Sequence, residues 1–512
     1  MDTISRWLAS DSYPTFPRLD RDIRVDVVIV GGGVMGISAA YMLKKAGVKV
    51  ALLERGRLGH SETGHTTAHL TYVTDTRLSG LIAKFGRDHA QAVWDAGNAA
   101  LHFIGRTVCE EQLACEYLQV PGYLHLPRGV HVDRQEIERL RNEAEVAREL
   151  GFDATFLESV CLVDRPGIRF DHQAEFHLLK YIHGLAAKIP GDGSYIFEDS
   201  EIREFRDDPL QVHANGAAVT CRYIIVATHV PLLGNNGLMS GAAFQSKLTG
   251  YSSYVIGASI PKGVAAPACF WDTHNPYDYV RIDPQSARDY VIYGGEDHKT
   301  GQVESTEQCY ARLQQRLLSL LPEAKIDRKW SGQIIESNDG LPFIGEIIPR
   351  QFVATAFGGN GITFSTIAAM MACDAVLKRK NPWTDLFDPH RKKMLGGTWD
   401  YFKENKDYPY YLLKDRFHGA EGGDPAALHP GDGKVLKVNG KKAACYRDED
   451  GKLHAVSAVC THMGCLVHFN SAERTWDCPC HGSRFTPDGK VTAGPAEEPL
   501  RQVYIPIRAD KA

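Results

Sequence analysis

A dense group of cysteines and histidines near the C-terminal end of the sequence constrains the fold of this chain more than any other feature. Four of the twelve cysteines fall within residues 460–480, and histidines are interleaved with them. The other eight cysteines are scattered singly between Cys109 and Cys445. A secreted disulfide framework would distribute its cysteines more evenly through a short chain. The group therefore indicates a metal site, and the scattered thiols favour a reducing compartment.

The group is divided between two loops, Cys-Thr-His-Met-Gly-Cys at residues 460–465 and Cys-Pro-Cys-His-Gly-Ser at residues 478–483. Their C-x-H and C-x-x-H spacings supply the donors of a Rieske [2Fe–2S] centre, two cysteines on one iron and two histidines on the other. Cys465 and Cys480 remain, one in each loop, and could form a bridge. Zinc also binds two cysteines and two histidines, but a zinc site explains neither the extra cysteines nor the flanking glycines. We expect His468 to be an exposed polar residue rather than a ligand.

Over residues 428–512 the boxes CTHxGC and CPCHGS resemble the Rieske proteins of cytochrome bc complexes. The resemblance implies a disulfide between Cys465 and Cys480. It also implies that the iron ligands are Cys460, His462, Cys478 and His481. Rieske oxygenases lack the two additional cysteines, so an oxygenase is not expected.

The second box departs from the respiratory pattern at one position. Respiratory Rieske proteins carry a tyrosine two residues after the serine, and its hydroxyl binds a ligand sulfur and raises the potential. This chain has Ser483 but Phe485. Because hydrogen bonds to the sulfurs strongly influence the potential, we expect a value in the middle of the Rieske range of roughly −150 to +300 mV.

The N-terminal region carries a second cofactor motif. A β-branched run at residues 25–31 leads into a G-x-G-x-x-G at Gly31, Gly33 and Gly36, then into helical spacing over residues 38–45 and a second strand that ends at Glu54. The three glycines permit a tight turn, the approach of a pyrophosphate and close helix–strand packing. The positive end of the helix dipole faces the phosphates. The carboxylate of Glu54 can accept hydrogen bonds from both ribose hydroxyls, whereas it would repel the ribose 2′-phosphate of NADP.

Four further segments bear on the choice between FAD and NAD. They are a small, hydroxyl-rich stretch at residues 59–70, a buried strand with a small-residue end at 223–229, a turn at 339–345, and a glycine-rich helix start at 358–363 followed by an apolar helix over 364–377. In this order they resemble the FAD-dependent amino acid oxidase-like family, which includes glycine, sarcosine and D-amino acid oxidases. The resemblance covers roughly residues 22–380.

The family resemblance implies a set of FAD-binding residues. Those expected around the adenosine diphosphate are Gly31, Gly33, Val34, Met35, Gly36, Glu54 and Arg55. Those expected around the ribityl chain and the isoalloxazine are Thr63, Thr66, Thr67, Ala227, Thr228, Gly359, Asn360, Gly361, Ile362 and Thr363. Some relatives tether FAD through a histidine near the second strand. His65 and His69 lie near that place but do not match the motif in register, so we predict non-covalent FAD.

A substrate domain is expected between the cofactor segments. Tyrosine-rich segments at residues 251–254, 277–281 and 290–298 have the alternation of strands in a sheet that covers the flavin. In the family an arginine or tyrosine of this sheet commonly holds the substrate carboxylate, which makes Arg281 the candidate catalytic residue. The alternative, that Arg281 is an exposed strand residue, stays open.

These features predict an α/β FAD-binding domain of the Rossmann-like type shared by glutathione reductase and D-amino acid oxidase, an interleaved α+β substrate domain, and a small all-β Rieske domain. The predicted oxidoreductase covers residues 1–395. Its FAD-binding pieces are about 22–80, 150–232 and 335–390, and its substrate pieces are about 81–149 and 233–334. A linker is expected at 396–427 and the Rieske domain at 428–512.

Composition excludes several classes of partner. The 58 basic and 63 acidic residues give a net charge of −5, which does not favour nucleic-acid binding. No apolar run reaches the roughly 18 residues that a membrane helix needs, and the first residues lack the apolar core of a signal peptide. We therefore expect a cytoplasmic protein without a transmembrane segment.

The two modules together suggest how electrons flow, because FAD takes two electrons and a [2Fe–2S] cluster takes one. The whole chain resembles bacterial Rieske-containing FAD oxidoreductases, and we expect a dehydrogenase of a small amine or amino acid. Its cluster would pass electrons to a one-electron acceptor protein or a quinone, or would receive them from a donor. Two alternatives stay open: an oxidase that uses O₂ and has a structural or regulatory cluster, and an electron carrier or redox sensor without a small substrate.

Overall fold

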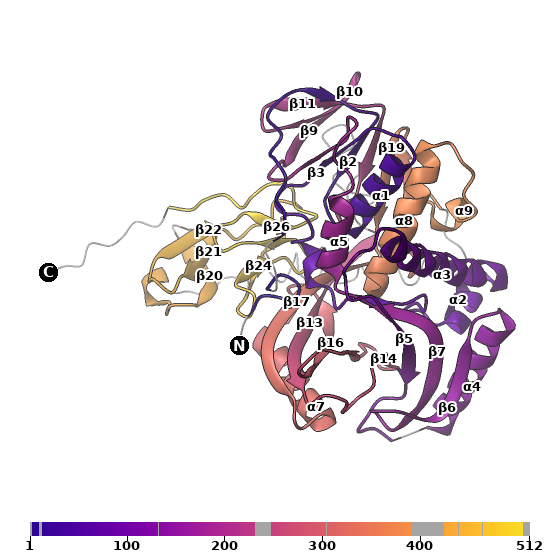
Figure 1. Cartoon of the computed structure of the whole chain (residues 1–512). Coiled ribbons are helices and arrows are strands. Elements are labelled where there is room, and N and C mark those ends of the chain that lie inside the picture. Colours follow the sequence, from indigo (N-terminus) through magenta and orange to yellow (C-terminus); the bar gives the residue numbers. More distant parts are fainter. Residues whose placement is uncertain are drawn as a thin grey trace.

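The computed structural model describes residues 3–9, 13–131, 133–230, 247–303, 305–391, 424–438, 440–462 and 464–504. These residues form a two-part α/β body and a small β domain that projects from one side of it (Figure 1). The predicted linker at 396–427 lies outside the described residues as far as residue 423. Among the described helices, none is both long enough and apolar enough to cross a membrane.

A six-stranded, mostly parallel sheet forms the centre of the first part. Its strand order is β18 (Phe343–Ile348), β19 (Gln351–Thr355), β12 (Tyr223–Val226), β2 (Val27–Val30), β3 (Val50–Leu53) and β8 (Tyr195–Phe197), with only β18 antiparallel to its neighbour. Strands β2 and β3 are buried along their whole length, as expected for a sheet covered on both faces.

Helices cover one face of this sheet and a small second sheet covers the other. The helices are α1 (Val34–Lys45), α5 (Leu178–Ala186) and α8 (Gly361–Val376), which share one apolar core with the sheet (Figure 1). The second sheet consists of β1 (Ile23–Arg24), β11 (Ala217–Thr220), β10 (Leu210–Ala214) and β9 (Ile202–Asp207), whose apolar residues pack against Val28 and Val30. The predicted strand–helix–strand unit is confirmed.

The second part of the body is built on a nine-stranded sheet. Its strands in order are β17 (Lys325–Ser337), β13 (Leu248–Ile260), β16 (Asp289–Lys299), β15 (Tyr279–Asp283), β14 (Cys269–Asp272), β5 (Leu118–His125), β7 (Arg165–Glu175) and β4 (His69–Leu70), and β6 (Ala154–Val160) pairs with β7. The accompanying helices are α2 (Leu78–Phe85), α3 (Arg87–Glu110), α4 (Arg134–Glu149) and α7 (Thr306–Leu320). The short helix α9 (Thr384–Phe387) belongs to the first part of the body, where the Phe387 ring packs against Phe364 of α8.

This sheet confirms the predicted tyrosine-rich strands and corrects one boundary. Strands β13, β15 and β16 pair with one another as neighbours. However, β6 and β7 belong to this sheet too, so the FAD-binding piece predicted from residue 150 begins too early. Alternating hydrophobic residues reveal which face of a strand is buried but not which strand lies beside it.

The C-terminal domain is all β, as predicted. Strands β20 (Gly433–Val438), β21 (Lys441–Arg447) and β22 (Leu453–Ser457) form one antiparallel sheet. The second sheet contains β23 (His468–Asn470), β24 (Thr475–Asp477), β25 (Arg484–Phe485) and β26 (Val491–Ala493). Trp476 and Phe485 are completely buried in the core of the domain.

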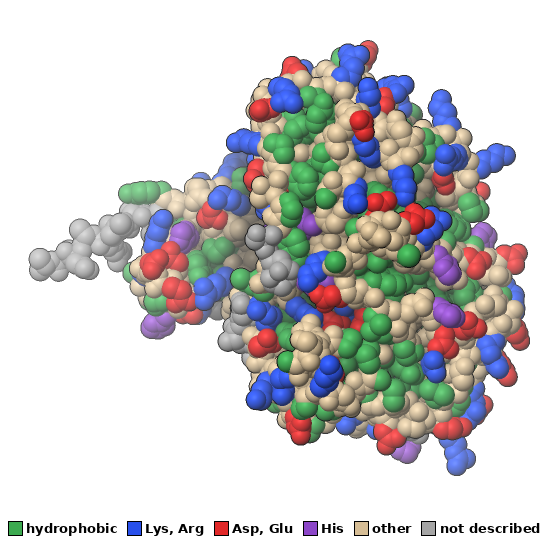
Figure 2. Space-filling view, viewed as in Figure 1, with side chains coloured by type: hydrophobic (Ala, Val, Ile, Leu, Met, Phe, Trp, Pro, Cys, Tyr) green, Lys and Arg blue, Asp and Glu red, His purple; other side chains and the backbone are tan. Residues whose placement is uncertain are grey.

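The C-terminal domain packs directly on the nine-stranded sheet. Gln333 Nε2 donates to Gly482 O at 2.6 Å, and Thr306 Oγ1 donates to Asn470 Oδ1 at 2.9 Å. His468 lies in this interface, with Nδ1 2.9 Å from Gly301 O, so the expectation that it is exposed is wrong. On the face in Figure 2, acidic and basic side chains are interspersed rather than gathered into a patch of one sign.

Candidate cofactor sites

One cavity of 1290 Å³ is lined by residues of both parts of the body and collects most of the residues predicted to bind FAD. The predicted residues on its wall are Gly31, Gly33, Val34, Met35, Glu54, Arg55, Thr63, Thr66, Thr67, Ala227, Thr228, Gly359, Asn360, Gly361 and Ile362. Gly36 and Thr363 are not part of the wall. Their binding roles stay predictions.

The turn between β2 and α1 has the geometry that a dinucleotide pyrophosphate requires. Gly31 has a φ of +105°, which favours glycine. A Cβ at Gly36 would collide with the carbonyl oxygen of Gly31, so this glycine lets α1 approach the strand. The N-cap residue of α1, Gly33, has no side chain that caps the helix. The N–H groups of the first turn can therefore bind an anion, and this end of the cavity fits the diphosphate of FAD.

Glu54 lies at the end of β3 in the cavity wall, where the sequence predicts it. Its Oε2 accepts a hydrogen bond from the Gly32 N–H at 2.7 Å, and its Oε1 accepts one from the Gly56 N–H at 2.9 Å. These two bonds fix the carboxylate beside the glycine turn. The remaining acceptor capacity of the two oxygens suits ribose hydroxyls.

Arg55 joins the cavity to the C-terminal domain. Its Nη2 donates to the carbonyl oxygen of Thr492 at 2.5 Å. Residues 491–498 of that domain line the cavity together with the glycine turn. No feature of the sequence indicates this contribution, because it depends on how the C-terminal domain docks.

The hydroxyl-rich segment is held in place by the N-terminal residues. Trp7 is completely buried, and its Nε1 donates to Thr66 O at 2.5 Å. Ser5 Oγ donates to Gly64 O, also at 2.5 Å. The segment that forms the cavity wall is therefore positioned by residues about sixty positions earlier in the chain.

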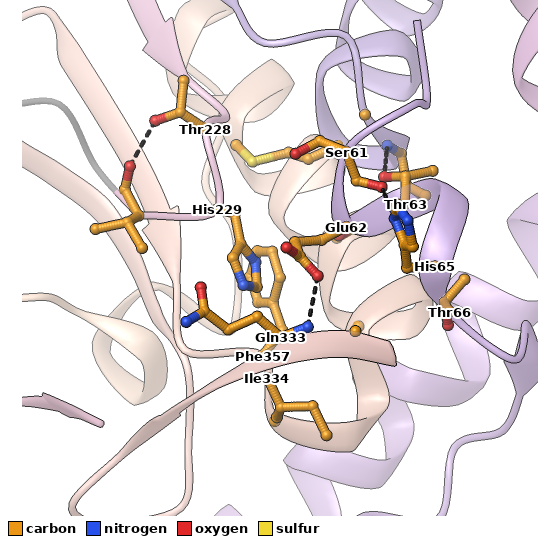
Figure 3. Close-up of a pocket in the computed structure, with 18 of the residues that line it drawn as sticks. Ser61, Glu62, Thr63, His65, Thr66, Thr228, His229, Gln333, Ile334 and Phe357 are labelled. Atoms are coloured by element: carbon orange, nitrogen blue, oxygen red, sulfur yellow. Dashed lines mark hydrogen bonds between the residues drawn. The ribbon is translucent and has the colours of Figure 1, made fainter. Parts of the chain in front are cut away.

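Glu62, His229 and Gln333 are among the wall residues that the sequence did not single out as binding residues. Glu62 Oε2 accepts a hydrogen bond from the Gln333 N–H at 2.6 Å, and the His229 ring lies beside Gln333 (Figure 3). Burial lowers the pKa of His229. Glu62 falls within the stretch that the sequence indicates, but nothing in the sequence relates it to Gln333, 271 residues later.

Asn360 and Thr363 fasten the start of α8 to the chain segment before α2. Asn360 Nδ2 donates to Val73 O at 2.9 Å, and Thr363 Oγ1 donates to Thr71 O at 2.7 Å. The Gly359 N–H donates to Asp75 Oδ2 at 2.7 Å. These bonds bring Asp75 to the glycine-rich helix start.

Arg281, the predicted binder of a substrate carboxylate, does not line the cavity. Its side chain is buried, forms an ion pair with Asp283 and lies 3.6 Å from Glu175. It donates to Ala68 O at 2.7 Å and to Phe176 O at 3.0 Å. The guanidinium is thus directed into the protein, where it holds the end of the hydroxyl-rich segment, and we withdraw it as a substrate-binding residue. It is not the exposed strand arginine of the alternative either.

The two histidines considered for a covalent link both line the cavity. His65 Nδ1 lies 2.9 Å from Ser61 O. His69 Nε2 lies 3.3 Å from Val280 O, and burial together with the charge of Arg281 lowers the pKa of His69 to about 4. Non-covalent FAD stays a prediction.

The predicted iron ligands come together in two tight loops. The Cys460 N–H donates to Cys465 O at 2.8 Å, and the Cys478 N–H donates to Ser483 O at 2.8 Å. The Cys460 and Cys478 thiols are in contact, and the rings of His462 and His481 lie 5.0 Å apart, nearly perpendicular. Burial lowers the pKa of both imidazoles to about 4. They are neutral at physiological pH, as metal ligands must be, so the donor set fits a [2Fe–2S] centre.

The structure contains the expected disulfide between Cys465 and Cys480, which joins the two loops. Phe485, which stands where respiratory Rieske proteins have a tyrosine, is completely buried. The intermediate reduction potential inferred from it stays a prediction.

Comparison with known proteins assigns both parts of the chain. A family model described as FAD dependent oxidoreductase (DAO) matches residues 26–375, and a Rieske [2Fe-2S] domain model matches residues 423–504. The chain belongs to the DAO family of FAD-dependent oxidoreductases and carries a Rieske domain. It is therefore an oxidoreductase with FAD and a [2Fe–2S] cluster.

Individual relatives match either the whole chain or its larger part. YhfW of Bacillus subtilis (strain 168), named as a Rieske 2Fe-2S iron-sulfur protein, is 32% identical over 98% of this chain and 97% of its own length. Gamma-glutamylputrescine oxidoreductase of Escherichia coli (strain K12) is 25% identical over 81% of this chain and 98% of its own. Glycine oxidase of Geobacillus kaustophilus shares the fold, with a TM-score of 0.59 at 18% identity over 72% of this chain and 99% of its own.

Proposed function

We propose that the enzyme is a dehydrogenase that oxidises a small amine or amino acid with FAD and passes the electrons one at a time to its Rieske cluster. The cluster then delivers them to an external one-electron acceptor, a protein or a quinone. The observation that carries this proposal is the position of Gln333, which touches the FAD cavity and the cluster loop at once.

Gln333 belongs to β17, between the two sites. Its backbone N–H donates to Glu62 in the cavity wall, and its Nε2 donates to Gly482 O, next to the ligand His481. The backbones also approach closely here, because a Cβ on Gly482 would lie 3.2 Å from Gly250 Cα. One packed residue thus separates the FAD cavity from a cluster ligand loop, which supports direct transfer within the chain.

The residues divide the work between two cofactors. Bound FAD supplies two-electron oxidation of the substrate, and the [2Fe–2S] cluster supplies one-electron transfer. The glycine turn and the first turn of α1 would hold the diphosphate, and Glu54 the ribose. The cluster would be held by Cys460, His462, Cys478 and His481. The tyrosine-rich strands would orient the substrate and exclude water.

The test is anaerobic mixing of the holoenzyme with a panel of amines and amino acids. We expect loss of flavin absorbance followed by the electron paramagnetic resonance signal of a reduced Rieske cluster. Full-rate peroxide formation in a flavin-loaded Cys478→Ala variant would show an oxidase instead. Reduction by a ferredoxin or an NADH-linked reductase, with no response to any member of the panel, would show an electron carrier.

A further inference from the structure

The FAD cavity extends to a second end that the dinucleotide motif does not account for. Four residues line this end. They are Asp75, Tyr277 just before β15, Tyr279 at the start of β15, and Asp297 on β16. We call these four residues the acidic end. Gly359 lies directly beside the acidic end, because a Cβ on Gly359 would be only 2.8 Å from Asp75 Oδ1. The acidic end therefore adjoins the helix start that the family resemblance assigns to the flavin ring.

Asp75 is a buried carboxylate with neutral partners. Its Oδ1 accepts a hydrogen bond from the Tyr277 hydroxyl at 2.9 Å, and its Oδ2 accepts one from the Gly359 N–H. Burial raises the pKa of Asp75 despite both bonds. A cation that entered the cavity would stabilise the ionised form.

The negative charge of Asp297 is stabilised by fewer hydrogen bonds than that of Asp75. The Oδ1 atom of Asp297 is buried and has no hydrogen-bond partner within the described part of the chain. A hydrogen bond with the Ser253 side chain favours its ionised form, but burial together with the charges of Asp75, Asp278 and Glu296 raises the pKa of Asp297 to about 7. A buried carboxylate without a counter-charge is costly, so this site favours a cationic ligand.

Aromatic rings complete the acidic end. The Tyr277 and Tyr279 rings lie 5.8 Å apart at an angle of 59°, and the Tyr279 hydroxyl is 2.8 Å from Ser253 Oγ. The His69 ring lies 5.8 Å from the Tyr279 ring and is neutral at physiological pH. Aromatic faces beside carboxylates attract ammonium groups by cation–π interaction and ion pairing.

The arginines that line the cavity are engaged elsewhere, which disfavours a substrate carboxylate. Arg77 lies 3.8 Å from Glu136. Arg55 binds the C-terminal domain, as described above. Arg203 and Arg206 lie on β9 in the other part of the body and form ion pairs with Glu201 and Glu204. A carboxylate at the acidic end would instead face Asp75 and Asp297.

We propose that the acidic end binds the protonated nitrogen of an amine that has no carboxylate on the carbon bearing that nitrogen. Asp297 pairs with the ammonium group, Asp75 adds negative charge, and the two tyrosines form the wall. This inference rests on the proposed function and narrows its substrate from amines and amino acids to amines.

Matched ligand pairs test the inference. Oxidised holoenzyme is titrated anaerobically with n-butylamine and with norvaline, which adds a carboxylate to the same chain, and likewise with benzylamine and phenylglycine. The flavin spectrum reports binding. We expect at least one amine to bind, and to bind about tenfold or more tightly than its carboxylated partner, a difference of roughly 1.4 kcal/mol. Equal or tighter binding of the amino acids, or no response to either amine, overturns the proposal.

Variants assign the effect to the acidic end. Asp297→Asn and Asp75→Asn should each weaken amine binding about tenfold while FAD content stays normal. Asp327→Asn is the matched control, because Asp327 Oδ1 also accepts a tyrosine hydroxyl bond, from Tyr290 at 2.8 Å, but lies outside the cavity wall. Unchanged amine binding in both Asp297→Asn and Asp75→Asn contradicts the proposal.

The outcomes separate this inference from the proposed function. Amino acids that bind and reduce both cofactors would uphold the dehydrogenase and overturn the amine preference. Amine binding that depends on Asp297, without any reduction of the cluster, would uphold the preference and overturn the dehydrogenase.

Discussion

At the scale of single residues, the ionisation of Asp297 opposes folding. Its pKa rises from 3.8 to about 7 in the folded protein, so the folded state is disfavoured increasingly as the pH rises from about 4 to 7. Asp297→Asn removes this cost. We expect the amine-free holoprotein of this variant to unfold at a higher temperature than the unsubstituted holoprotein at pH 8, by at most the equivalent of about 4 kcal/mol, and to show a smaller gain at pH 5. Calorimetry at the two pH values checks this, and an unchanged midpoint at pH 8 contradicts it.

Arg281 shows that a residue type alone does not reveal where its side chain points. The sequence suggested an arginine that binds a substrate carboxylate, but the guanidinium points into the protein. Arg281→Leu leaves Glu175 buried without its guanidinium and leaves Asp283 with Arg6 as its remaining ion-pair partner. We therefore expect a loss of about 3–5 kcal/mol in unfolding free energy. Arg222→Leu removes the surface pair with Asp26 and should cost less than about 1 kcal/mol. Thermal unfolding of the two variants makes the comparison. If Arg281→Leu is as stable as the unsubstituted protein but has a raised KM for amino acids, Arg281 would again be a candidate for binding the substrate carboxylate.

At the scale of elements, β17 links the two cofactor sites through Gln333. Gln333→Leu removes the bond to Gly482 O but keeps the strand. We expect amine to reduce the flavin at a normal rate and the cluster to be reduced severalfold more slowly, as measured by stopped-flow absorbance and rapid-freeze resonance spectroscopy. Thr306→Val is the control, since it deletes an interface bond outside the cavity wall. Equal slowing in both variants would indicate a general effect of docking rather than a role of Gln333.

Elements defined by local sequence could be predicted, but not which elements lie beside one another in space. The glycine turn, the strand ending at Glu54 and the two cluster loops each depend on residues within about thirty positions of one another, and all three were predicted. The membership of β7 in the nine-stranded sheet and the contact between Glu62 and Gln333 depend on residues far apart in the chain. No periodicity or spacing encodes such pairings, which explains why the cofactors were predicted but the wall between them was not.

At the scale of the whole molecule, the C-terminal domain contributes to the cavity that fits FAD. Residues 491–498 line it, and Thr492 O accepts the bond from Arg55, which follows Glu54 at the end of β3. If FAD binds only when the C-terminal domain is docked, FAD binding stabilises docking, and docking strengthens FAD binding, by the same free energy. FAD binding and the seating of the C-terminal domain should therefore be linked.

Hydrogen exchange on the full chain, with FAD and after its removal, measures this linkage. We expect FAD to slow amide exchange in two regions. One is the glycine turn at residues 31–36, which it would contact, and the other is the docking contact where Gly482 of the C-terminal domain packs against Gly250 and Thr300 of the body. The second region lies outside the cavity wall, so its protection reports docking rather than direct contact with FAD. Exchange that changes only at residues 31–36 would mean that the domain docks independently of FAD, and that the two sites are neighbours without being coupled.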